Sequence, residues 1–431
     1  MPQKKVKFDV TDIENFAYDM KRCIKCAGCK WVEHTYMPGI NFSMRCPSAQ
    51  KFLFDTYGAY GRVRTALSML EGKVNYSDKF LDVVYKCQMC GACDVGCKRN
   101  LDLEIQLALE AIRVKCVADG KGPLPAHRKV AEKIGKTNNR FGSPHANRAK
   151  WLPADVKPAA KADIVYFVGC AASYTHPEIA KSTARILKAA GTPFMLLPDE
   201  WCCGNPLYTT GMIDEAKRVA EHNIEAIKKT GASTVLVSCA EGYRMLKVDY
   251  PKMFKMSTSD LGFKVVHLVE YVDELVKKGA LKLQNKLDMR LTYHDSCNLA
   301  RLSEPWVYWE GTHEQWGCVN PPLERRRGTY GIYQQPRDIL SAIPGLKLVE
   351  MIRIKENTLC CGAGGGVRDA FKDFALWTAN ERLKEVREIG VEAIVSACPY
   401  CKDNFAEAIK INGDEIKVYD ISELVWQAIS K

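Results

Sequence analysis

The spacing of the cysteines constrains this chain more than any other feature of its sequence. The chain has 431 residues and 19 cysteines, and most of these are adjacent to one another or separated by two residues. Adjacent cysteines do not readily bridge each other, and Cys-x-x-Cys runs in a large intracellular chain usually bind metal. The pattern therefore predicts metal centres rather than a disulfide framework.

Two runs near the amino terminus have the spacing of ferredoxin ligands. Residues 23–29 and 87–93 each hold three cysteines separated by two residues, and a fourth cysteine follows each run, at Cys46 and Cys97. In two-cluster ferredoxins the fourth ligand comes from the other run. Two zinc sites are the alternative, but zinc usually takes two Cys-x-x-Cys halves. We therefore predict two [4Fe–4S] cubane clusters, one bound by Cys23, Cys26, Cys29 and Cys97 and the other by Cys87, Cys90, Cys93 and Cys46.

From residue 163 onward short apolar segments alternate with helical patterns, which predicts an α/β layer with a mainly parallel sheet. The pattern occurs twice. A Cys-Cys-Gly site is followed by a strand ending in cysteine, with 36 positions from Cys203 to Cys239 and 37 from Cys361 to Cys398. An internal duplication is the simplest explanation.

These patterns divide the chain into four parts. We expect an α-helical two-cluster ferredoxin domain over residues 1–120 and a linker rich in Pro, Gly and Asn over 121–162. A first α/β cysteine-rich domain should occupy residues 163–285, and a second should occupy 286–431. The linker is expected to lie over the next domain.

The combination of a single Cys, a Cys-Cys-Gly and a Cys-x-x-Cys resembles the cysteine-rich (CCG) domain of heterodisulfide reductase catalytic subunits. A two-cluster ferredoxin domain fused to two such domains resembles the D-type subunit of that family. Similar fusions include BamD, which is the electron-transfer component of class II benzoyl-coenzyme A reductase. The resemblance implies an oxidoreductase subunit in which each complete repeat binds a noncubane [4Fe–4S] centre through five cysteines.

The second repeat matches the family pattern in full, and the first does not. The second has all five cysteines, whereas Gly242 replaces the fifth cysteine of the first. Four thiolates in the first repeat are compatible with a further cluster, with zinc or with no metal. The resemblance implies these ligands: Cys297, Cys360, Cys361, Cys398 and Cys401 in the second repeat, and Cys170, Cys202, Cys203 and Cys239 in the first.

The second repeat also carries an insertion. Between Cys297 and Cys360 lie 62 residues, against 31 between Cys170 and Cys202. The insertion is interpreted as a lid, a docking surface or a plain surface loop, and it contains Trp306, Trp309, Trp316, Cys318 and Arg325–Arg327. Cys116, in a predicted helix, should be a buried small hydrophobe, and Cys318 is a weak candidate ligand.

Two further motifs have more than one interpretation. The glycine-rich run 362–366 lacks the acidic residue of a dinucleotide site, so it should let backbone amides approach cluster sulfurs. His294 and Asp295, beside Cys297, are candidates to orient or protonate a substrate thiol, although a structural histidine is the more common role.

The net charge is +11, and basic residues flank both ferredoxin runs. No nucleic-acid-binding motif accompanies them, so we predict no nucleic-acid partner. The cations should offset cluster charge, steer an acidic redox partner or form a solvated surface. The sequence shows no signal peptide and no long apolar segment, which favours a cytoplasmic protein reaching a membrane only through a partner.

No flavin or nicotinamide fingerprint is present, so a flavoprotein or another iron–sulfur subunit is the expected redox partner. Two hypotheses follow for the terminal centre: a relay to a partner subunit, or a catalytic reductase for a disulfide. The incomplete first repeat favours the relay. A zinc-structured scaffold without redox activity would leave the ferredoxin runs unexplained.

Overall fold

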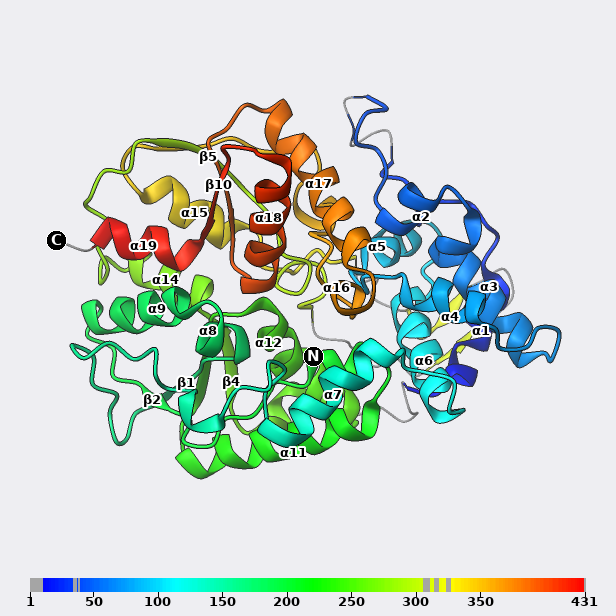
Figure 1. The fold of residues 1–431 in the computed structure, drawn as a ribbon, viewed down its shortest axis with the longest axis horizontal. Coiled ribbons are helices and arrows are strands. Elements are labelled where there is room, and N and C mark those ends of the chain that lie inside the picture. The colour runs from blue at the N-terminus through cyan, green and yellow to red at the C-terminus, as the bar shows by residue number, and fades with distance from the viewer. Residues whose placement is uncertain are drawn as a thin grey trace.

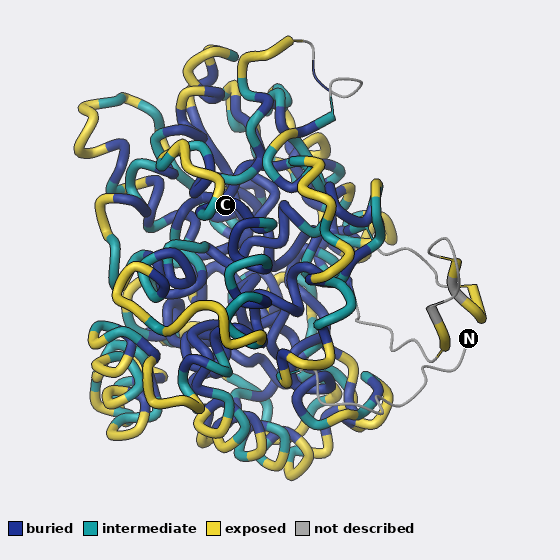
Figure 2. The backbone as a smooth tube through the Cα atoms, turned by 90° about the vertical axis from the view of Figure 1, so that its right-hand side faces the viewer, coloured by how far each residue is buried: buried dark blue, intermediate teal, exposed yellow. Residues whose placement is uncertain are grey.

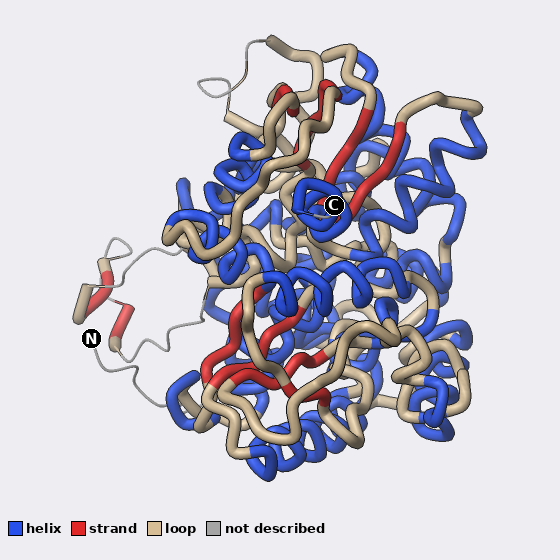
Figure 3. The backbone as a smooth tube through the Cα atoms, turned by 90° about the vertical axis from the view of Figure 1, so that its left-hand side faces the viewer, coloured by secondary structure: helices blue, strands red, loops and turns tan. Residues whose placement is uncertain are grey.

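Two four-stranded parallel sheets with equivalent strand orders organise the chain from residue 164 onward (Figure 3). The computed structural model describes residues 11–33, 37, 39–304, 311–313, 318–322 and 327–429. The first sheet has the order β2-β1-β3-β4 and the second the order β8-β5-β9-β10. Their strands are β1 (Ile164–Phe167), β2 (Met195–Leu196), β3 (Thr234–Val237), β4 (Lys264–His267), β5 (Met289–Tyr293), β8 (Leu346–Leu348), β9 (Ala393–Ser396) and β10 (Lys417–Asp420).

The two α/β units pack through reciprocal helix contacts. Helix α9 (Pro177–Ala189) of the first unit packs against α19 (Ile421–Ile429) of the second, and α15 (Gln334–Ala342) of the second packs against α14 (Leu268–Lys277) of the first. The helices correspond in position, because α9 and α15 each precede the second strand of their own sheet in chain order, and α14 and α19 each follow its last strand. The contacts are therefore those of a pseudo-twofold pair, and one hydrophobic core spans both sheets (Figure 2).

The remaining helices of the α/β units connect strands or carry cysteines. They are α8 (Cys170–Tyr174), α10 (Asn205–Tyr208), α11 (Ile213–Thr230), α12 (Ala240–Arg244), α13 (Tyr250–Met253), α16 (Val367–Ala370), α17 (Lys372–Glu388) and α18 (Pro399–Asn412). A short antiparallel pair, β6 (Thr312–His313) and β7 (Val319–Asn320), lies in the inserted segment.

A helical unit with its own core precedes the sheets and lies beside both of them (Figure 1). Its central helix, α6, is buried on most sides because it packs against α3 and α5 and also faces the α/β units. The helices are α1 (Ala17–Arg22), α2 (Pro47–Phe52), α3 (Ala59–Leu70), α4 (Asp78–Tyr85), α5 (Ala92–Asn100) and α6 (Ile105–Ala118).

The segment predicted as a linker contains helix α7 (Pro125–Thr137). Pro125 opens the helix, where its missing N–H costs nothing, and Asn138 ends it in a left-handed conformation. The Asn138 carbonyl then accepts a hydrogen bond of 2.8 Å from the amide of Cys202. The segment thus lies over the first α/β unit, as the sequence suggested, but as an ordered helix that the Pro- and Gly-rich composition concealed.

Among the described residues, no helix is long and apolar enough to cross a membrane. The cytoplasmic location stays a prediction.

Candidate metal centres

The four cysteines predicted for the first cluster converge between α1, the loop after it and α5. Cys23 ends α1, Cys26 and Cys29 lie in the loop, and Cys97 lies in α5. The residues on either side of Cys26 have φ of 58° and 62°, so this loop turns through left-handed conformations around the cysteine. Burial raises the pKa of Cys97, and the nearby Cys29 and Cys23 thiols raise it further. The structure therefore brings the predicted set together, with its fourth cysteine from the other run.

The second predicted set converges in the same crossed manner. Cys87, Cys90 and Cys93 follow α4, and Cys46 approaches from the loop before α2. Burial raises the pKa of Cys46 to about 12 against the attraction of Arg62, and the Cys87 and Cys90 thiols add to the rise. The Cys46 thiol therefore stays protonated until a cation displaces the proton. Cys90 differs, because its hydrogen-bonding contact with Cys360 lowers its pKa to about 5 against the effect of burial.

The five cysteines of the second repeat gather at the carboxyl end of its sheet. Cys297 follows β5, Cys360 and Cys361 follow β8, and Cys398 and Cys401 open α18. The Cys360 thiol is in hydrogen-bonding contact with Cys297 and Cys361, and the Cys361 and Cys401 sulfurs are 3.2 Å apart. All five are buried. Carboxyl ends of parallel strands meet at one edge, which is why these cysteines from separate strands lie together.

The first repeat brings together only part of its predicted set. The Cys170 thiol is in hydrogen-bonding contact with Cys202, which in turn contacts Cys203. Cys239 differs, because its thiol makes its hydrogen-bonding contact with Cys398 of the second repeat. The cysteines of the two repeats therefore face one another across the pseudo-twofold interface.

Gly242 lies in α12 with open space around it. A Cβ placed there would meet only the Cβ of Cys239, at 3.9 Å, which is an ordinary contact. The missing fifth cysteine is therefore a difference in side chain and not in backbone position.

Backbone amides approach a thiol at the same place in both repeats. The Gly204 amide donates to the Cys202 sulfur at 3.4 Å, and the Gly362 amide donates to the Cys360 sulfur at 3.3 Å. Both glycines have positive φ, 85° and 97°. Amide donors of this kind stabilise thiolate charge, so Gly362 has the role predicted for the start of the glycine-rich run.

The rest of the glycine-rich run packs against the second ferredoxin group. A Cβ on Gly365 would lie 2.6 Å from the carbonyl oxygen of Cys87, and one on Gly364 would lie 2.9 Å from that of Gln88. Only residues without side chains allow this approach. The run therefore serves to bring two cysteine groups close together, a role that the sequence did not indicate.

Cys90 is the point where the ferredoxin cysteines reach the second repeat. Its side chain packs with Cys297 and Cys360 in one small buried cluster. Arg301 fixes this contact by donating to the Cys90 carbonyl at 2.7 Å. Arg113 of α6, fully buried, donates at 2.7 Å to the carbonyls of Cys87 in the helical unit, Gly365 in the second repeat and Thr209 in the first.

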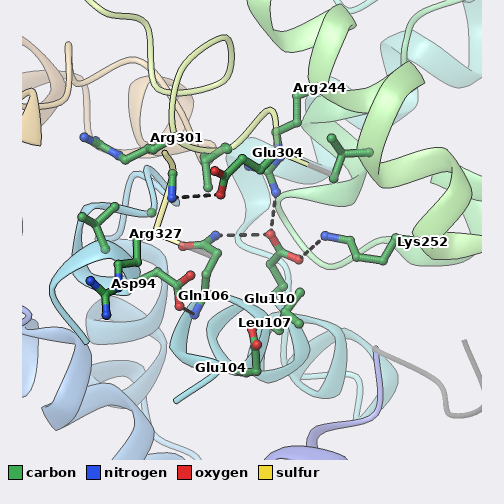
Figure 4. Close-up of a pocket in the computed structure, with 15 residues that line it drawn as sticks. Asp94, Glu104, Gln106, Leu107, Glu110, Arg244, Lys252, Arg301, Glu304 and Arg327 are labelled. Atoms are coloured by element: carbon green, nitrogen blue, oxygen red, sulfur yellow. Dashed lines mark hydrogen bonds and ion pairs between the residues drawn. The ribbon is translucent and has the colours of Figure 1, made fainter. Parts of the chain in front are cut away.

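The helical unit meets the first repeat through a buried charged cluster beside a cavity of about 60 Å³ (Figure 4). Arg244 and Lys252 both form ion pairs with Glu110 of α6, at 2.5 and 2.9 Å, and both also form ion pairs with Asp249. Burial opposes ionisation of Glu110, but Lys252 and Arg244 hold its pKa at about 2. Sequence reasoning missed this cluster because its members come from segments far apart in the chain.

Arg148, from the segment predicted as a linker, is a further residue that the sequence did not single out. It pairs with Glu200 at 2.5 Å and lies 3.8 Å from the Cys170 sulfur. Glu200 in turn accepts the amides of Val168 and Gly169, which fixes the turn before Cys170. The cation thus sits where a thiolate of the first repeat would be stabilised.

Asp295 and His294 have different environments. Asp295 accepts two hydrogen bonds from Arg337, at 2.8 and 2.9 Å, and one from the Lys355 amide, so its role is structural. The His294 ring is buried, and one nitrogen lies within 4.8 Å of the sulfurs of both Cys361 and Cys401.

The two remaining cysteines, Cys116 and Cys318, have different environments. Cys116 is fully buried in the core of the helical unit, as predicted. Cys318 is exposed and belongs to no group of potential ligands among the described residues. Trp306, Trp309, Trp316, Arg325 and Arg326 lie outside the described residues.

Many basic residues near the ferredoxin runs have structural partners. Lys86 pairs with Asp82, Lys98 is buried against Glu104, and Arg45 is buried against backbone carbonyls. Lys21, Arg22 and Lys25, next to the first run, are exposed.

The donors fit iron–sulfur clusters. Soft thiolates select iron–sulfur clusters or zinc, and these thiols are buried, grouped and approached by amide donors. The orphaned ring nitrogens of His294 at the second-repeat group also fit a site that is completed by a bound group.

Comparison with known proteins finds the same kinds of domain in the same order along the chain. A 4Fe-4S dicluster domain matches residues 19–101, and a cysteine-rich domain matches residues 164–247 and 315–406. The chain is 28% identical to the B-type subunit of the fumarate reductase (CoM/CoB) of Methanothermobacter marburgensis, over 80% of this chain and 62% of that one. It is 26% identical to an EtfAB:quinone oxidoreductase of Syntrophomonas wolfei, over 98% of this chain and 60% of that one.

A relative of similar length supports the assignment of the chain to a family. The D-type subunit of the dihydromethanophenazine:CoB–CoM heterodisulfide reductase of Methanosarcina acetivorans is 34% identical over 95% of this chain and 94% of its own. These relatives are oxidoreductase subunits, and the domain matched over residues 19–101 is a 4Fe-4S dicluster domain. The chain therefore belongs to the family of iron–sulfur oxidoreductase subunits that is typified by the D-type subunit of heterodisulfide reductase.

Proposed function

We propose that this chain is the electron-transfer subunit of a heterodisulfide-reductase-like complex, connecting two cubane clusters and a noncubane [4Fe–4S] centre to a partner redox subunit. The ligands proposed for the cubanes are Cys23, Cys26, Cys29 and Cys97, and Cys46, Cys87, Cys90 and Cys93. Those proposed for the noncubane centre are Cys297, Cys360, Cys361, Cys398 and Cys401.

The contact between Cys90 and Cys360 is the observation that carries this proposal. When bound, the clusters supply one-electron transfer. The chain holds one cysteine group against the next through Arg301, Arg113 and the glycine-rich run, so that a ferredoxin group and the terminal group share a buried contact. Short separations between redox groups are what a relay requires.

The first cysteine group is the one exposed toward a partner. Cys26 is exposed and borders an open hollow of 490 Å³ together with Trp31 and Ile40. Ile24, Trp31 and Ile40 are 68%, 40% and 76% exposed, and cationic Lys25 lies beside them. The hollow is also lined by Glu33, so the charge around it is mixed. An exposed apolar patch of this kind suits a redox subunit, either a flavoprotein or another iron–sulfur protein.

The first repeat is proposed to hold a cubane, a zinc ion or no metal. Its four thiols cannot supply five-thiolate ligation without a substitute for Gly242, and Cys239 contacts the other repeat.

A disulfide reductase is the second candidate. The similar D-type relatives are named as heterodisulfide reductase subunits, and Cys239 and Cys398 face one another between the repeats. A reductase should turn over a small disulfide with an artificial electron donor and no other subunit. A relay should show no such turnover and should need its partner.

Metal analysis of anaerobically purified protein tests the proposal. Iron, sulfide and zinc are measured together with electron paramagnetic resonance (EPR) in reduced and thiol-oxidised states. Two cubanes and one noncubane centre correspond to about 12 iron atoms, and a cluster in the first repeat as well would give about 16. Only about 8, with or without zinc, would contradict the terminal centre.

A further inference from the structure

His294 is a buried histidine that lies beside the cysteines of the second repeat. It follows β5 directly, is 1% exposed, and stands edge-on to Phe405 with ring centroids 4.9 Å apart. Neither ring nitrogen has a hydrogen bond of ordinary geometry among the described residues, but the ring is in hydrogen-bonding contact with the Cys361 thiol. One ring nitrogen lies within 4.8 Å of the sulfurs of both Cys361 and Cys401.

An unpaired buried polar group destabilises the fold, by roughly 1–3 kcal/mol. The other two buried histidines each have one partner, since His127 is 2.9 Å from the Gly366 carbonyl and His267 accepts the Val269 amide at 3.2 Å. A purely structural role at position 294 would be better served by an apolar ring. The histidine therefore needs a partner that sits among the second-repeat thiolates.

The first repeat carries that apolar ring at the equivalent position. Tyr166 pairs with Leu236 and Tyr293 pairs with Val395, each partner lying three residues before the cysteine that ends its strand. Tyr166 and Tyr293 are also each four residues before the single cysteine of their repeat. His294 is therefore equivalent to Phe167, which is buried and apolar. The histidine and the fifth cysteine occur together in one repeat and are both missing from the other.

We propose that His294 is a positioning residue that donates its ring N–H to the thiolate sulfur of Cys361 in the second-repeat centre. This inference rests on the proposed function, because the Cys361 sulfur is a cluster ligand only when the centre is bound. A neutral imidazole has one N–H to donate. Donation to a ligand sulfur stabilises the reduced, more negative state, so it raises the reduction potential of that centre. Phe167 cannot do this for any group bound in the first repeat.

The test replaces His294 and follows the spectrum and the potential of the second-repeat centre. His294→Phe reproduces the first repeat, and His294→Asn keeps an N–H donor. His267→Asn is the matched control, because it removes a buried histidine far from the second-repeat thiols and leaves a good helix N-cap. EPR-monitored redox titrations are combined with pulsed EPR on protein labelled with ¹⁵N-histidine.

We expect the Phe variant to keep its iron and to show a lower potential for the second-repeat centre alone. The Asn variant should recover part of the shift, and the control should match the wild type. A weak ¹⁵N coupling in the wild type should disappear in the Phe variant. If that variant does not fold, the coupling in the labelled wild type still decides the question.

Two results would overturn the donor role. One is an unchanged potential, or no ¹⁵N coupling in a wild type that holds its centre. The other is a strong coupling with iron lost from the Phe variant, which would identify an iron ligand. Absence of second-repeat iron from the wild type would overturn this inference and the proposed function together, and iron analysis distinguishes that case.

Discussion

The two cysteine-rich repeats have the same backbone plan and different sites. Their sheets share strand order, and their helices exchange equivalent contacts across the interface. The second repeat holds five cysteines and His294 at one sheet edge, whereas the first has Gly242 and Phe167 at the matching positions. The difference shows that the fold does not decide the chemistry, because a few side chains at strand ends are enough to change it.

The repeats also differ in how they meet the ferredoxin groups. The second repeat packs cysteine on cysteine against Cys90, through glycines that permit close approach. The first meets the helical unit through the charged cluster around Glu110, which contains no thiol. The second repeat therefore contacts the helical unit through thiols and the first contacts it through buried ion pairs.

Removing a ligand from the second repeat should have the largest effect. We expect Cys401→Ala to lose about 4 iron atoms and the terminal EPR signal while both ferredoxin clusters remain. Cys116→Ala, a buried cysteine outside the sites, is the control and should keep full iron content. Retention of all iron by the Cys401 variant would show that the centre is assigned to the wrong residues.

Adding the missing ligand to the first repeat should have the next largest effect. Gly242→Cys places a fifth thiol where a Cβ meets only Cys239, at 3.9 Å, so the fold should tolerate it. We expect a change in iron content or spectrum at this repeat, and no change for Gly242→Ser, which has similar volume and no thiol. Identical spectra for both variants would contradict the view that one side chain separates the repeats.

Neutralising the anchor of the first repeat should destabilise the protein without removing a ligand. Glu110→Gln leaves the cations of Arg244 and Lys252 buried with one carboxylate partner removed. We expect the free energy of unfolding, measured with denaturant, to fall by about 3–5 kcal/mol. The surface variant Glu274→Gln, whose partner is Lys278, should change little.

The pH dependence of the same anchor follows from its pKa. The pKa of Glu110 is held at about 2, below its unfolded value near 4.3. The stabilisation is therefore complete above pH ~4.3 and is lost as pH falls toward 2. Wild-type stability that does not decline across that range faster than that of the Gln variant would count against the ionised cluster.

The interface between the repeats should give the smallest effect. Burial opposes protonation of His176, but Asp403 of the second repeat and Glu178 of the first raise its pKa to about 9. Stability from this group is complete below pH ~6.5 and is lost as pH rises through 9. Because His176 is partly exposed, we expect the free energy of unfolding to fall by only ~1–2 kcal/mol over this pH range. The decrease should be absent in His176→Gln and should persist in a His222→Gln control.

Much of this protein could be read from local sequence patterns. Cys-x-x-Cys spacing identified the ferredoxin runs, and apolar strands ending at Cys170, Cys239, Cys297 and Cys398 predicted two parallel sheets that the structure confirms. The edge strands β4 and β10 were not predicted, because each runs directly into a helix and no cysteine marks its end. Helix α7 was missed because Pro and Gly near its ends suggested a linker.

The sequence by itself determined which residue types occur at each strand end, since spacing along one chain is a local property. Only the tertiary structure decided which of these ends meet. The contacts of Cys239 with Cys398 and of Cys90 with Cys360, and the burial of His294 beside Cys361, join segments far apart in the sequence. Such contacts follow from the packing of whole sheets and helices, so no short sequence pattern encodes them.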